Sequence, residues 1–206
     1  MLFFWRHRRA DMKAAQALYD KAVAQARHPS FYISYGVADT VDGRFDMICL
    51  HAFMVMERLS SEGKPGQAIN QALFDVMFNN MDLVLREMGV GDLGIPKHIK
   101  RMMKAFHGRA AVYRKAVRED DSAALLEALQ RNVFRKQDHV SPAVLRMMAA
   151  YVTASLDILR QTALQDLQAG NLKFAAPDND KPESHKPDDH KEDHKNDTDT
   201  RAGMVA

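Results

Sequence analysis

The sequence predicts an all-α protein: a single compact helical domain of about six helices, followed by a disordered C-terminal tail. Two observations lead to this prediction. Apolar residues recur at helical spacing through most of the chain, as in helices that bury one face. From residue 176 the chain is dominated by Asp, Lys, His, Pro and Asn, a composition too polar to form a core. We therefore expect an N-terminal apolar and basic segment at 1–10, a helical domain at 11–175 and a tail at 176–206.

The first helix is expected at residues 11–27, where small and apolar residues recur at helical spacing. The dipeptide His28-Pro29 should end it, because the residue before a proline is disfavoured in the α region. Three aromatic residues then cluster before a glycine. Phe31, Tyr32 and Tyr35 predict an irregular segment packed against the core.

The second helix should begin at Asp39, Thr40 or Asp42, each of which is a competent N-cap. Its apolar series includes Cys49, the only cysteine, so no internal disulfide or Cys-based zinc cluster is expected. A thiol in such a series is normally a small buried hydrophobe and not a nucleophile. His51 in the same helix lacks a second metal ligand at helical spacing. We interpret it as a hydrogen-bonded core or boundary residue.

Four further helices follow, separated by turn residues. Gly89 is placed to end the first of them, and Pro96 is placed at the start of the next. Asp121 or Ser122 is the N-cap candidate for the third of them, and Ser141 is the candidate for the last. The expected helices span residues 67–88, 96–118 and 122–133, with a long helix from Pro142 that ends before Gly170.

The helix at 67–88 should be largely buried, apart from a narrow polar stripe. Asp75, Asp82 and Arg86 share this stripe, because residues three, four or seven positions apart lie on one side of a helix. The Glu-x-x-His pairs of carboxylate-bridged metal bundles are absent from the sequence. We therefore interpret the stripe as a salt-bridged seam whose partners are Arg44 or Arg109.

The helix at 96–118 is the most amphipathic segment, with one apolar and one basic face. Gly108 falls within the basic face, where a missing side chain would let another molecule approach the backbone. This face is either an ordinary solvated surface or a contact surface for ribosomal RNA, anionic lipid or an acidic protein. Its basic residues are Lys97, Lys100, Arg101, Lys104, Lys115 and Arg118.

No run of 18 or more apolar residues is present, so no single helix is expected to span a membrane. The segment 1–10 places apolar residues before basic ones, unlike an export signal. It is either a membrane-surface contact or a staple onto the first helix. No catalytic, cofactor or metal site is expected, since the tail residues His185, His190 and His194 have no fixed geometry.

A series of short, unusual blocks in a fixed order, over roughly residues 11–165, resembles the ubiquinol-cytochrome c chaperone family. The blocks are Phe31-Tyr32, Gly36-Val37-Ala38-Asp39-Thr40, Asp42-Gly43-Arg44-Phe45, Leu73-Phe74-Asp75, Asp82, Leu85-Arg86-Glu87-Met88-Gly89-Val90-Gly91-Asp92, Pro96-Lys97 and Phe106-His107-Gly108-Arg109.

The resemblance implies an all-helical, non-enzymatic assembly factor for ubiquinol-cytochrome c reductase, respiratory complex III. The implied client is newly made cytochrome b or another complex III subunit. Mitochondrial members work with a small helper protein near the ribosomal exit tunnel. Because no organelle-targeting presequence is evident, we expect a bacterial member that is cytoplasmic or peripheral on the inner membrane, docks on the ribosome or an anionic membrane surface, and does not bind DNA.

Residue chemistry and resemblance together predict two sets of residues. Thirteen methionines would supply an adaptable apolar surface for the client, and the basic helix would supply a docking surface. The partner-binding candidates are Lys97, Lys100, Arg101, Lys104, Gly108, Met102 and Met103. The structural motif consists of Gly36, Asp39, Thr40, Asp42, Gly43, Arg44, Asp75, Asp82, Arg86, Asp92 and Arg109.

Two other functions remain open at this point. An RNA-binding or ribosome-associated translation factor without a membrane-protein client would act mainly through the basic helix and bind RNA in a salt-sensitive way. An enzyme of unrecognised type would show a pocket with converging titratable groups.

Overall fold

The computed structural model describes residues 2–135, 137 and 139–177, and within these residues every regular element is a helix. This confirms the all-α prediction. The predicted tail lies outside the described residues beyond position 177. In chain order the helices are α1 (Leu2–Ala26), α2 (Pro29–Ile33), α3 (Val41–Ser60), α4 (Gly63–Glu87), α5 (Ile95–Arg118), α6 (Ser122–Asn132), α7 (Pro142–Gln161) and α8 (Leu164–Gln168).

The helix boundaries differ from the prediction at several points. α1 begins at Leu2 and not near residue 11, because the preceding residues contain no glycine or proline to stop the helix. α4 begins at Gly63, inside the expected loop, since the first turn of a helix tolerates proline. The segment that begins with Phe31 and Tyr32 was predicted to be irregular, but it is partly the short helix α2, because five residues are too few to show a helical period. The helix predicted from Pro142 to before Gly170 ends at Gln161, and α8 follows it as a separate short helix.

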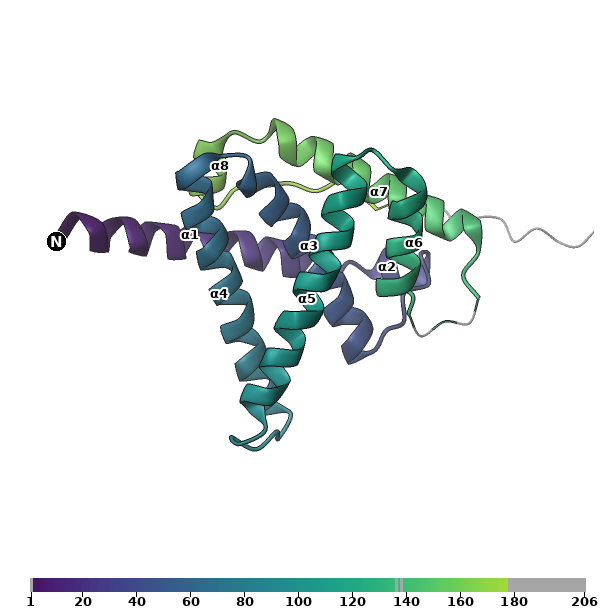
Figure 1. Cartoon of the computed structure of the whole chain (residues 1–206), viewed down its shortest axis with the longest axis horizontal. Coiled ribbons are helices and arrows are strands. Elements are labelled where there is room, and N and C mark those ends of the chain that lie inside the picture. Colours follow the sequence, from purple (N-terminus) through teal and green to yellow (C-terminus); the bar gives the residue numbers. More distant parts are fainter. Residues whose placement is uncertain (1, 136, 138, 178–206) are drawn as a thin grey trace, which may run out of the picture.

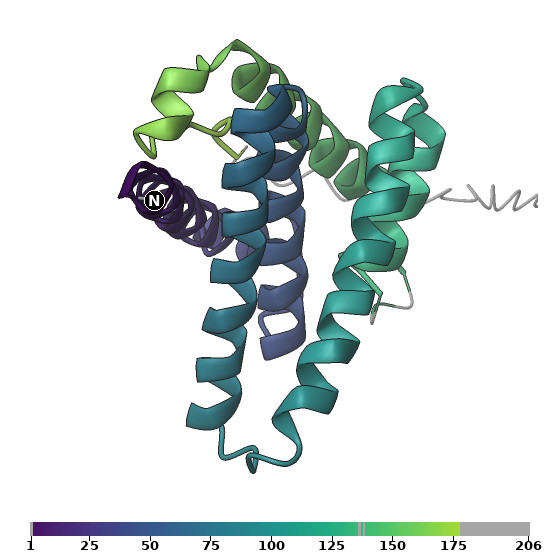
Figure 2. The same cartoon turned by 60° about the vertical axis from the view of Figure 1, so that its left-hand side comes forward.

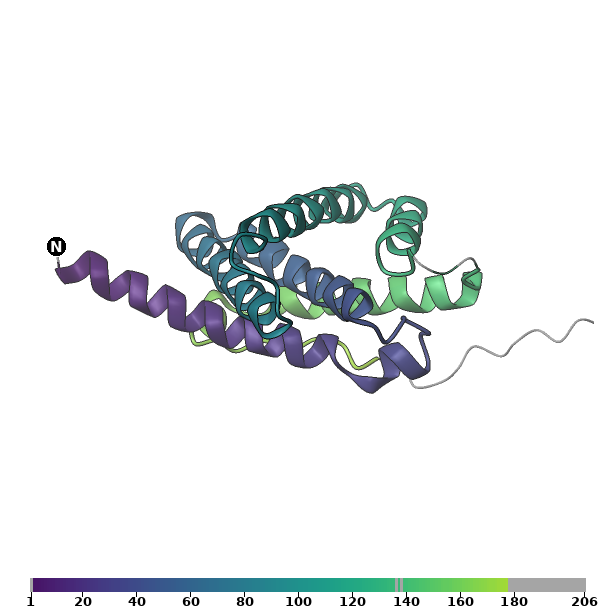
Figure 3. The same ribbon diagram turned by 90° about the horizontal axis from the view of Figure 1, so that it is seen from below.

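Helix α3 is the centre of the fold. It packs against α1, α4, α5 and α7, and every residue from 46 to 56 is buried. α1 and α2 lie on one side of α3, and α5 and α6 lie on the other (Figure 3). Because α3 is covered all round, it shows almost no polar face, which explains why its sequence reads as nearly continuous apolar residues.

Two parts of the chain extend beyond this packed body. The N-terminal end of α1 runs past the other helices, and the α4–α5 hairpin projects away from the body (Figures 1 and 2). The last described segment, after α8, lies along the body. There the backbone amide of Ala175 donates to Ser155 Oγ (3.2 Å), and Gln25 Nε2 donates to the carbonyl oxygen of Ala175 (3.2 Å).

Local signals in the sequence explain how α3 and α4 are bounded. Thr40 is the N-cap of α3, because its hydroxyl accepts from the amide of Gly43 at 3.1 Å. A β-carbon at position 43 would overlap the carbonyl oxygen of Ala38, so only glycine permits this tight entry. At the C-terminal end of α4, Gly89 follows the C-cap residue Met88 and has a φ of 80°, as predicted for a glycine that ends a helix.

His51 lies at the middle of an aromatic cluster that joins α2, α3 and α7. Its Nδ1 is 2.8 Å from the carbonyl oxygen of Met47, which can only accept, so Nδ1 carries the proton and Nε2 accepts from the Tyr151 hydroxyl (2.7 Å). The Phe31 ring meets Tyr151 edge to face, with centroids 4.9 Å apart. This confirms that His51 and the aromatic residues near it are packing residues. Burial lowers the pKa of His51 to about 4.

The depressed pKa of His51 predicts a loss of stability in mild acid. The unfolded chain takes up a proton near pH 6.5 and the folded chain only near pH 4, so the stability contributed by neutral His51 is lost as the pH falls through this window. The loss should reach about 3 kcal/mol, since each pKa unit corresponds to about 1.4 kcal/mol. Urea unfolding of the wild type across this pH range measures it.

The matched control is His51→Gln, which keeps a hydrogen-bonding side chain but cannot take up a proton at these pH values. Its free energy of unfolding should be lower than that of the wild type at pH 7 and should vary less between pH 6.5 and pH 4. Equal slopes for the two proteins would show that other groups cause the acid sensitivity.

Candidate functional site

A groove of about 560 Å³ opens between α4 and α5, with α3 as its floor. Its deep residues, Phe53, Met56 and Phe106, are apolar and buried, whereas Phe74 and Met103 are only partly covered. The remaining lining residues are one small residue, Ala110, and five with amide, imidazole or guanidinium groups: Gln67, Asn70, Gln71, His107 and Arg114.

The wall where α4 meets α5 is built from aromatic rings in contact. Phe74 packs against Phe78 with centroids 4.7 Å apart, and against Phe106 at 6.1 Å. The imidazole of His107 stacks nearly parallel on Phe74, at 5.1 Å and 27°. His107 is exposed, so this stack forms part of the rim of the groove. Rings in such offset pairs hold one another in place, and the wall is therefore preformed.

The polar groups at the rim hold fixed positions. Asn70 Nδ2 donates to the carbonyl oxygen of Met56 (3.3 Å), and Gln71 Nε2 donates to Asp75 Oδ1 (2.9 Å). Arg114 Nε is 2.9 Å from Glu57 Oε2. An apolar floor under a rim of amides suits the binding of apolar side chains from a partner helix.

The predicted methionine surface is mostly wrong. Of the methionines among the described residues, Met47, Met54, Met56, Met77, Met81 and Met148 are buried in the core. The helical period that revealed these residues also places them on inward faces, so flexible side chains serve core packing here. Met102 and Met103, the two partner-binding candidates, are partly covered, and Met88 is exposed.

The predicted basic face of α5 is on the surface. Lys97, Lys100, Arg101 and Lys104 are all exposed, and none of them pairs with a carboxylate of the described residues. Gly108 is exposed too, and a β-carbon built on it would meet nothing within 4 Å. Glycine inside a helix costs about 1 kcal/mol relative to alanine. Packing within the described residues therefore gives no reason for glycine at this position.

The predicted seam of Asp75, Asp82 and Arg86 with Arg44 or Arg109 is wrong. Arg86 pairs with Asp82 at 2.7 Å and also with Asp92, all on the surface of the hairpin. Asp75 accepts from Gln71, and Arg44 pairs with the nearby Asp39 at 2.6 Å. The error has a simple cause, since the polar stripe of α4 faces solvent and does not face another helix.

The buried ion-pair network is centred on Asp46, a residue that the sequence reasoning did not select. Asp46 has 3% exposure, and its two carboxylate oxygens lie 2.7 Å from Arg109 Nη2 and 2.8 Å from Arg135 Nε. Arg135 also reaches Asp42 at 3.6 Å. Burial raises the pKa of Asp46, and the two arginines oppose that shift by favouring the carboxylate. One feature of the sequence could have identified Asp46, namely an acidic residue within an otherwise apolar helix.

This network links the family-like motif to α5 and α6. The carbonyl oxygen of Gly36 accepts from Gln137 Nε2 (2.6 Å), so the segment after α6 holds both the turn before α3 and, through Arg135 and Asp46, α3 itself. Arg109 Nη1 also lies 3.6 Å from Cys49 Sγ. Burial raises the pKa of the Cys49 thiol to about 12, with Arg109 opposing, so the thiol stays protonated and acts as a core side chain.

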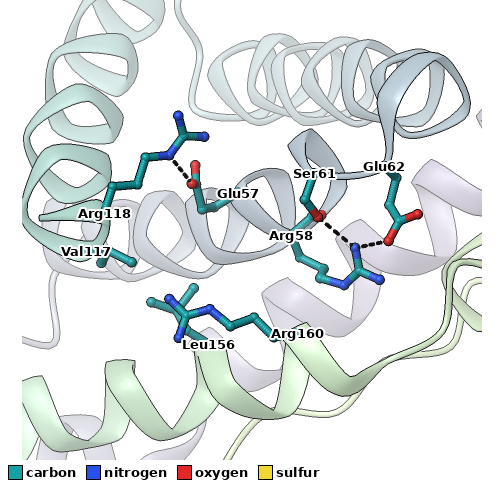
Figure 4. A pocket seen from close by; sticks show the side chains of 8 residues that line it. All are labelled: Glu57, Arg58, Ser61, Glu62, Val117, Arg118, Leu156 and Arg160. Carbon is teal, nitrogen blue, oxygen red and sulfur yellow. Dashed lines mark hydrogen bonds and ion pairs between the residues drawn. The ribbon is translucent and has the colours of Figure 1, made fainter. Parts of the chain in front are cut away.

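A second pocket, of about 320 Å³, lies where α3, α5 and α7 meet (Figure 4). The charged side chains on its walls already have partners. Arg118 Nε is 2.6 Å from Glu57 Oε1, Arg58 pairs with Glu62, and Arg160 pairs with the neighbouring Asp157 at 2.7 Å. Every arginine on the walls of this pocket is thus engaged by a carboxylate, and Glu57 is shared by Arg118 and Arg114.

Arg58 also fastens the end of α7. Its Nε donates to the carbonyl oxygen of Leu159 (2.8 Å), and its Nη2 donates to that of Thr162 (2.7 Å). These carbonyl groups lie at the end of the helix, where the amide of Thr162 also donates to the carbonyl oxygen of Leu159 (3.1 Å). Among the helices of the described residues, α7 is the only one that is long and apolar enough to cross a membrane. It packs against α3 and α6, however, and a core helix passes the same test.

The Asp46 network predicts a sharp difference between two aspartate variants. Asp46→Ala leaves the largely buried Arg109 without its carboxylate, which should cost about 3–5 kcal/mol of folding free energy. Asp82→Ala removes a solvent-exposed pair within one helix and should unfold at the same denaturant concentration as the wild type. Urea titration of the three proteins measures both effects. Equal losses in the two variants would contradict this assignment of the buried network.

Comparison with known proteins identifies the family. A family model described as ubiquinol-cytochrome C chaperone matches residues 34–174. Ubiquinol-cytochrome c reductase complex assembly factor 1 of Mus musculus is 25% identical over 154 residues, covering 75% of this chain and 52% of the mouse protein. The Xenopus laevis protein of the same description is 24% identical over 154 residues, covering 75% of this chain and 76% of its own length. This chain thus spans about half the length of its mouse relative.

A solved structure agrees with the sequence matches. The crystal structure of the Cbp3 homolog from Brucella abortus superposes with a TM-score of 0.74 and 33% sequence identity, over 85% of this chain and 96% of that one. The resemblance drawn from the short sequence blocks is thereby confirmed. The chain belongs to the ubiquinol-cytochrome c chaperone family, a family of assembly chaperones for respiratory complex III.

Proposed function

We propose that this protein assists the assembly of respiratory complex III by holding newly made cytochrome b, or another complex III subunit, in the groove between α4 and α5. The observation that carries the proposal is the groove itself, with apolar rings and methionines under a rim of amides. A membrane protein presents apolar helices to water before it is assembled. Covering one such helix is a task that an apolar groove can perform without covalent chemistry.

The chemistry of the groove suits a client with varied side chains. Met103, which is only partly covered, has a flexible, polarisable side chain that can repack around different partners. Gly108 does not line the groove but falls within the basic face of α5, where a partner backbone can approach the helix without meeting a side chain. Within the described residues no group of three His, Cys, Asp or Glu is placed to hold a metal ion.

The basic face of α5 supplies the docking part of the proposed function. Four exposed cations within two turns of helix repel one another, and a polyanionic partner offsets this repulsion. Lys97, Lys100, Arg101 and Lys104 would hold the chaperone where cytochrome b is made, on the cytoplasmic side and peripheral to the inner membrane. A small helper protein and the ribosome are further partners that the family resemblance implies.

A strain lacking the gene tests the function as a whole. We expect its absorption spectrum to lose the b- and c-type cytochromes of complex III and to keep those of other complexes, because an assembly chaperone acts on one client set. Complementation with the wild-type gene should restore them. A normal cytochrome spectrum, combined with salt-sensitive binding of the protein to RNA, would favour the translation-factor alternative.

A single charge placed in the groove tests the binding site. Gln71→Glu puts a carboxylate where an apolar client helix would sit, and burying an unpaired charge weakens binding. A penalty of about 1.4 kcal/mol corresponds to tenfold weaker binding. We expect recovery of cytochrome b with the chaperone to fall by about that factor, as measured by photo-cross-linking from position 107.

The matched control is Gln16→Glu on α1. Gln16 is exposed like Gln71 and makes the same contact, because its Nε2 donates to Asp20 Oδ1 at 2.9 Å, four residues along the helix. Both variants lose one hydrogen bond and gain one like-charge pair, so their stabilities should match. Equal cross-linking yields from the two variants would place the client elsewhere.

A further inference from the structure

The α4–α5 hairpin exposes three large apolar side chains at or near its tip. Leu93 is 100% exposed, Leu83 is 57% exposed and Met88 is 56% exposed. Half of the large apolar side chains that are exposed among the described residues thus lie on this one hairpin. The hairpin also projects from the body (Figures 1 and 2), so its tip can contact another surface while the body stays clear of it.

Cations gather directly behind this tip. Between residues 82 and 104 there are five basic and three acidic side chains. Two of the acids, Asp82 and Asp92, are both paired with Arg86. The first three turns of α5 then carry Lys97, Lys100, Arg101 and Lys104, all exposed. The hairpin therefore combines an aliphatic end with a cationic base.

This combination favours a lipid surface over RNA or a protein. Proteins that bind single-stranded RNA stack its bases on aromatic rings, and residues 79–105 contain no Phe, Tyr or Trp. A protein partner would be expected to use the preformed groove, which lies nearer the body. Aliphatic side chains at the end of a projection, with lysines one or two turns behind, fit the acyl boundary and the headgroup phosphates of a bilayer, respectively.

We propose that the α4–α5 hairpin docks on an anionic lipid bilayer, with Leu93 and Met88 entering the acyl boundary and Lys97, Lys100 and Lys104 contacting headgroup phosphates. Arg86 pairs with Asp92 beside the inserted leucine, which lowers the cost of bringing that carboxylate to the membrane surface. The groove lies between the same two helices, further from the tip, and so stays at the membrane surface where a client emerges. This inference rests on the proposed function, because docking at the membrane serves a chaperone whose client is a membrane protein.

A position-resolved vesicle experiment tests this docking. Full-length Leu93→Cys is labelled with an environment-sensitive dye and mixed with phosphatidylcholine vesicles that either contain or lack phosphatidylglycerol. The native Cys49 is buried and stays unlabelled, so the dye reports on the tip. We expect a blue shift with the anionic vesicles, none with the neutral ones, and reversal by added salt.

The label is also placed at Ile33, which is 67% exposed on α2 and separate from the hairpin. Equal shifts at positions 33 and 93 would overturn the proposal, because they would indicate general adsorption. No shift at position 93, even when the protein co-floats with vesicles, would also overturn it and would assign binding to the N-terminal segment. Salt-sensitive binding to ribosomes without any vesicle binding would assign the cations to RNA. None of these outcomes bears on cytochrome b cross-linking, since no client is present.

Charge removal supplies the matched comparison. Replacing Lys97, Lys100 and Lys104 together by glutamine should weaken vesicle binding about a hundredfold, since each lysine near an anionic surface contributes about fivefold. Replacing the exposed lysines Lys13, Lys21 and Lys173 by glutamine removes the same charge from elsewhere. The control should bind nearly as the wild type does. If both triple variants bound vesicles equally weakly, net charge alone would explain the loss of binding, and the proposed surface would be overturned.

Discussion

The burial of α3 on all sides is the constraint on which the rest of the structure depends. A helix with no solvent-facing side must find partners inside the protein for each of its polar side chains. Asp46 is held by Arg109 of α5 and by Arg135 after α6, and His51 is held by Tyr151 of α7. Arg58 donates to the carbonyl groups at the end of α7. These contacts tie α5, α6 and α7 to one central helix at defined positions.

This arrangement separates a rigid body from the surfaces proposed to act. The polar partners of α3 lie in the body, whereas the groove opens where α4 and α5 part, and the aliphatic tip lies at the end of the hairpin. Half-covered residues such as Met103 and Phe74 occur on this hairpin because only part of its apolar face has a neighbour. The family-like turn around Gly36 and Gly43 then has a structural role, since it fixes the entry into α3.

The two errors of sequence interpretation have related causes. Polar residues at helical spacing on α4 were assigned to an interhelical seam, although they face solvent and pair among themselves. Methionines were assigned to a surface, although most of them fill the core around α3. In both cases the helical period shows which residues share a face. It does not show whether another helix covers that face, because this depends on contacts between residues far apart in the chain.

The sequence by itself determined the helical class, most helix boundaries, the capping residue Thr40, the C-terminal glycine of α4 and the basic face of α5, because each follows from residues within a few positions of one another. It also contained the blocks that identify the family. Only the tertiary structure decided that Arg109 meets Asp46, that α4 and α5 part to form a groove, and that Leu93 projects at a tip. These features depend on how helices pack across long sequence separations, and local spacing carries no information about such packing.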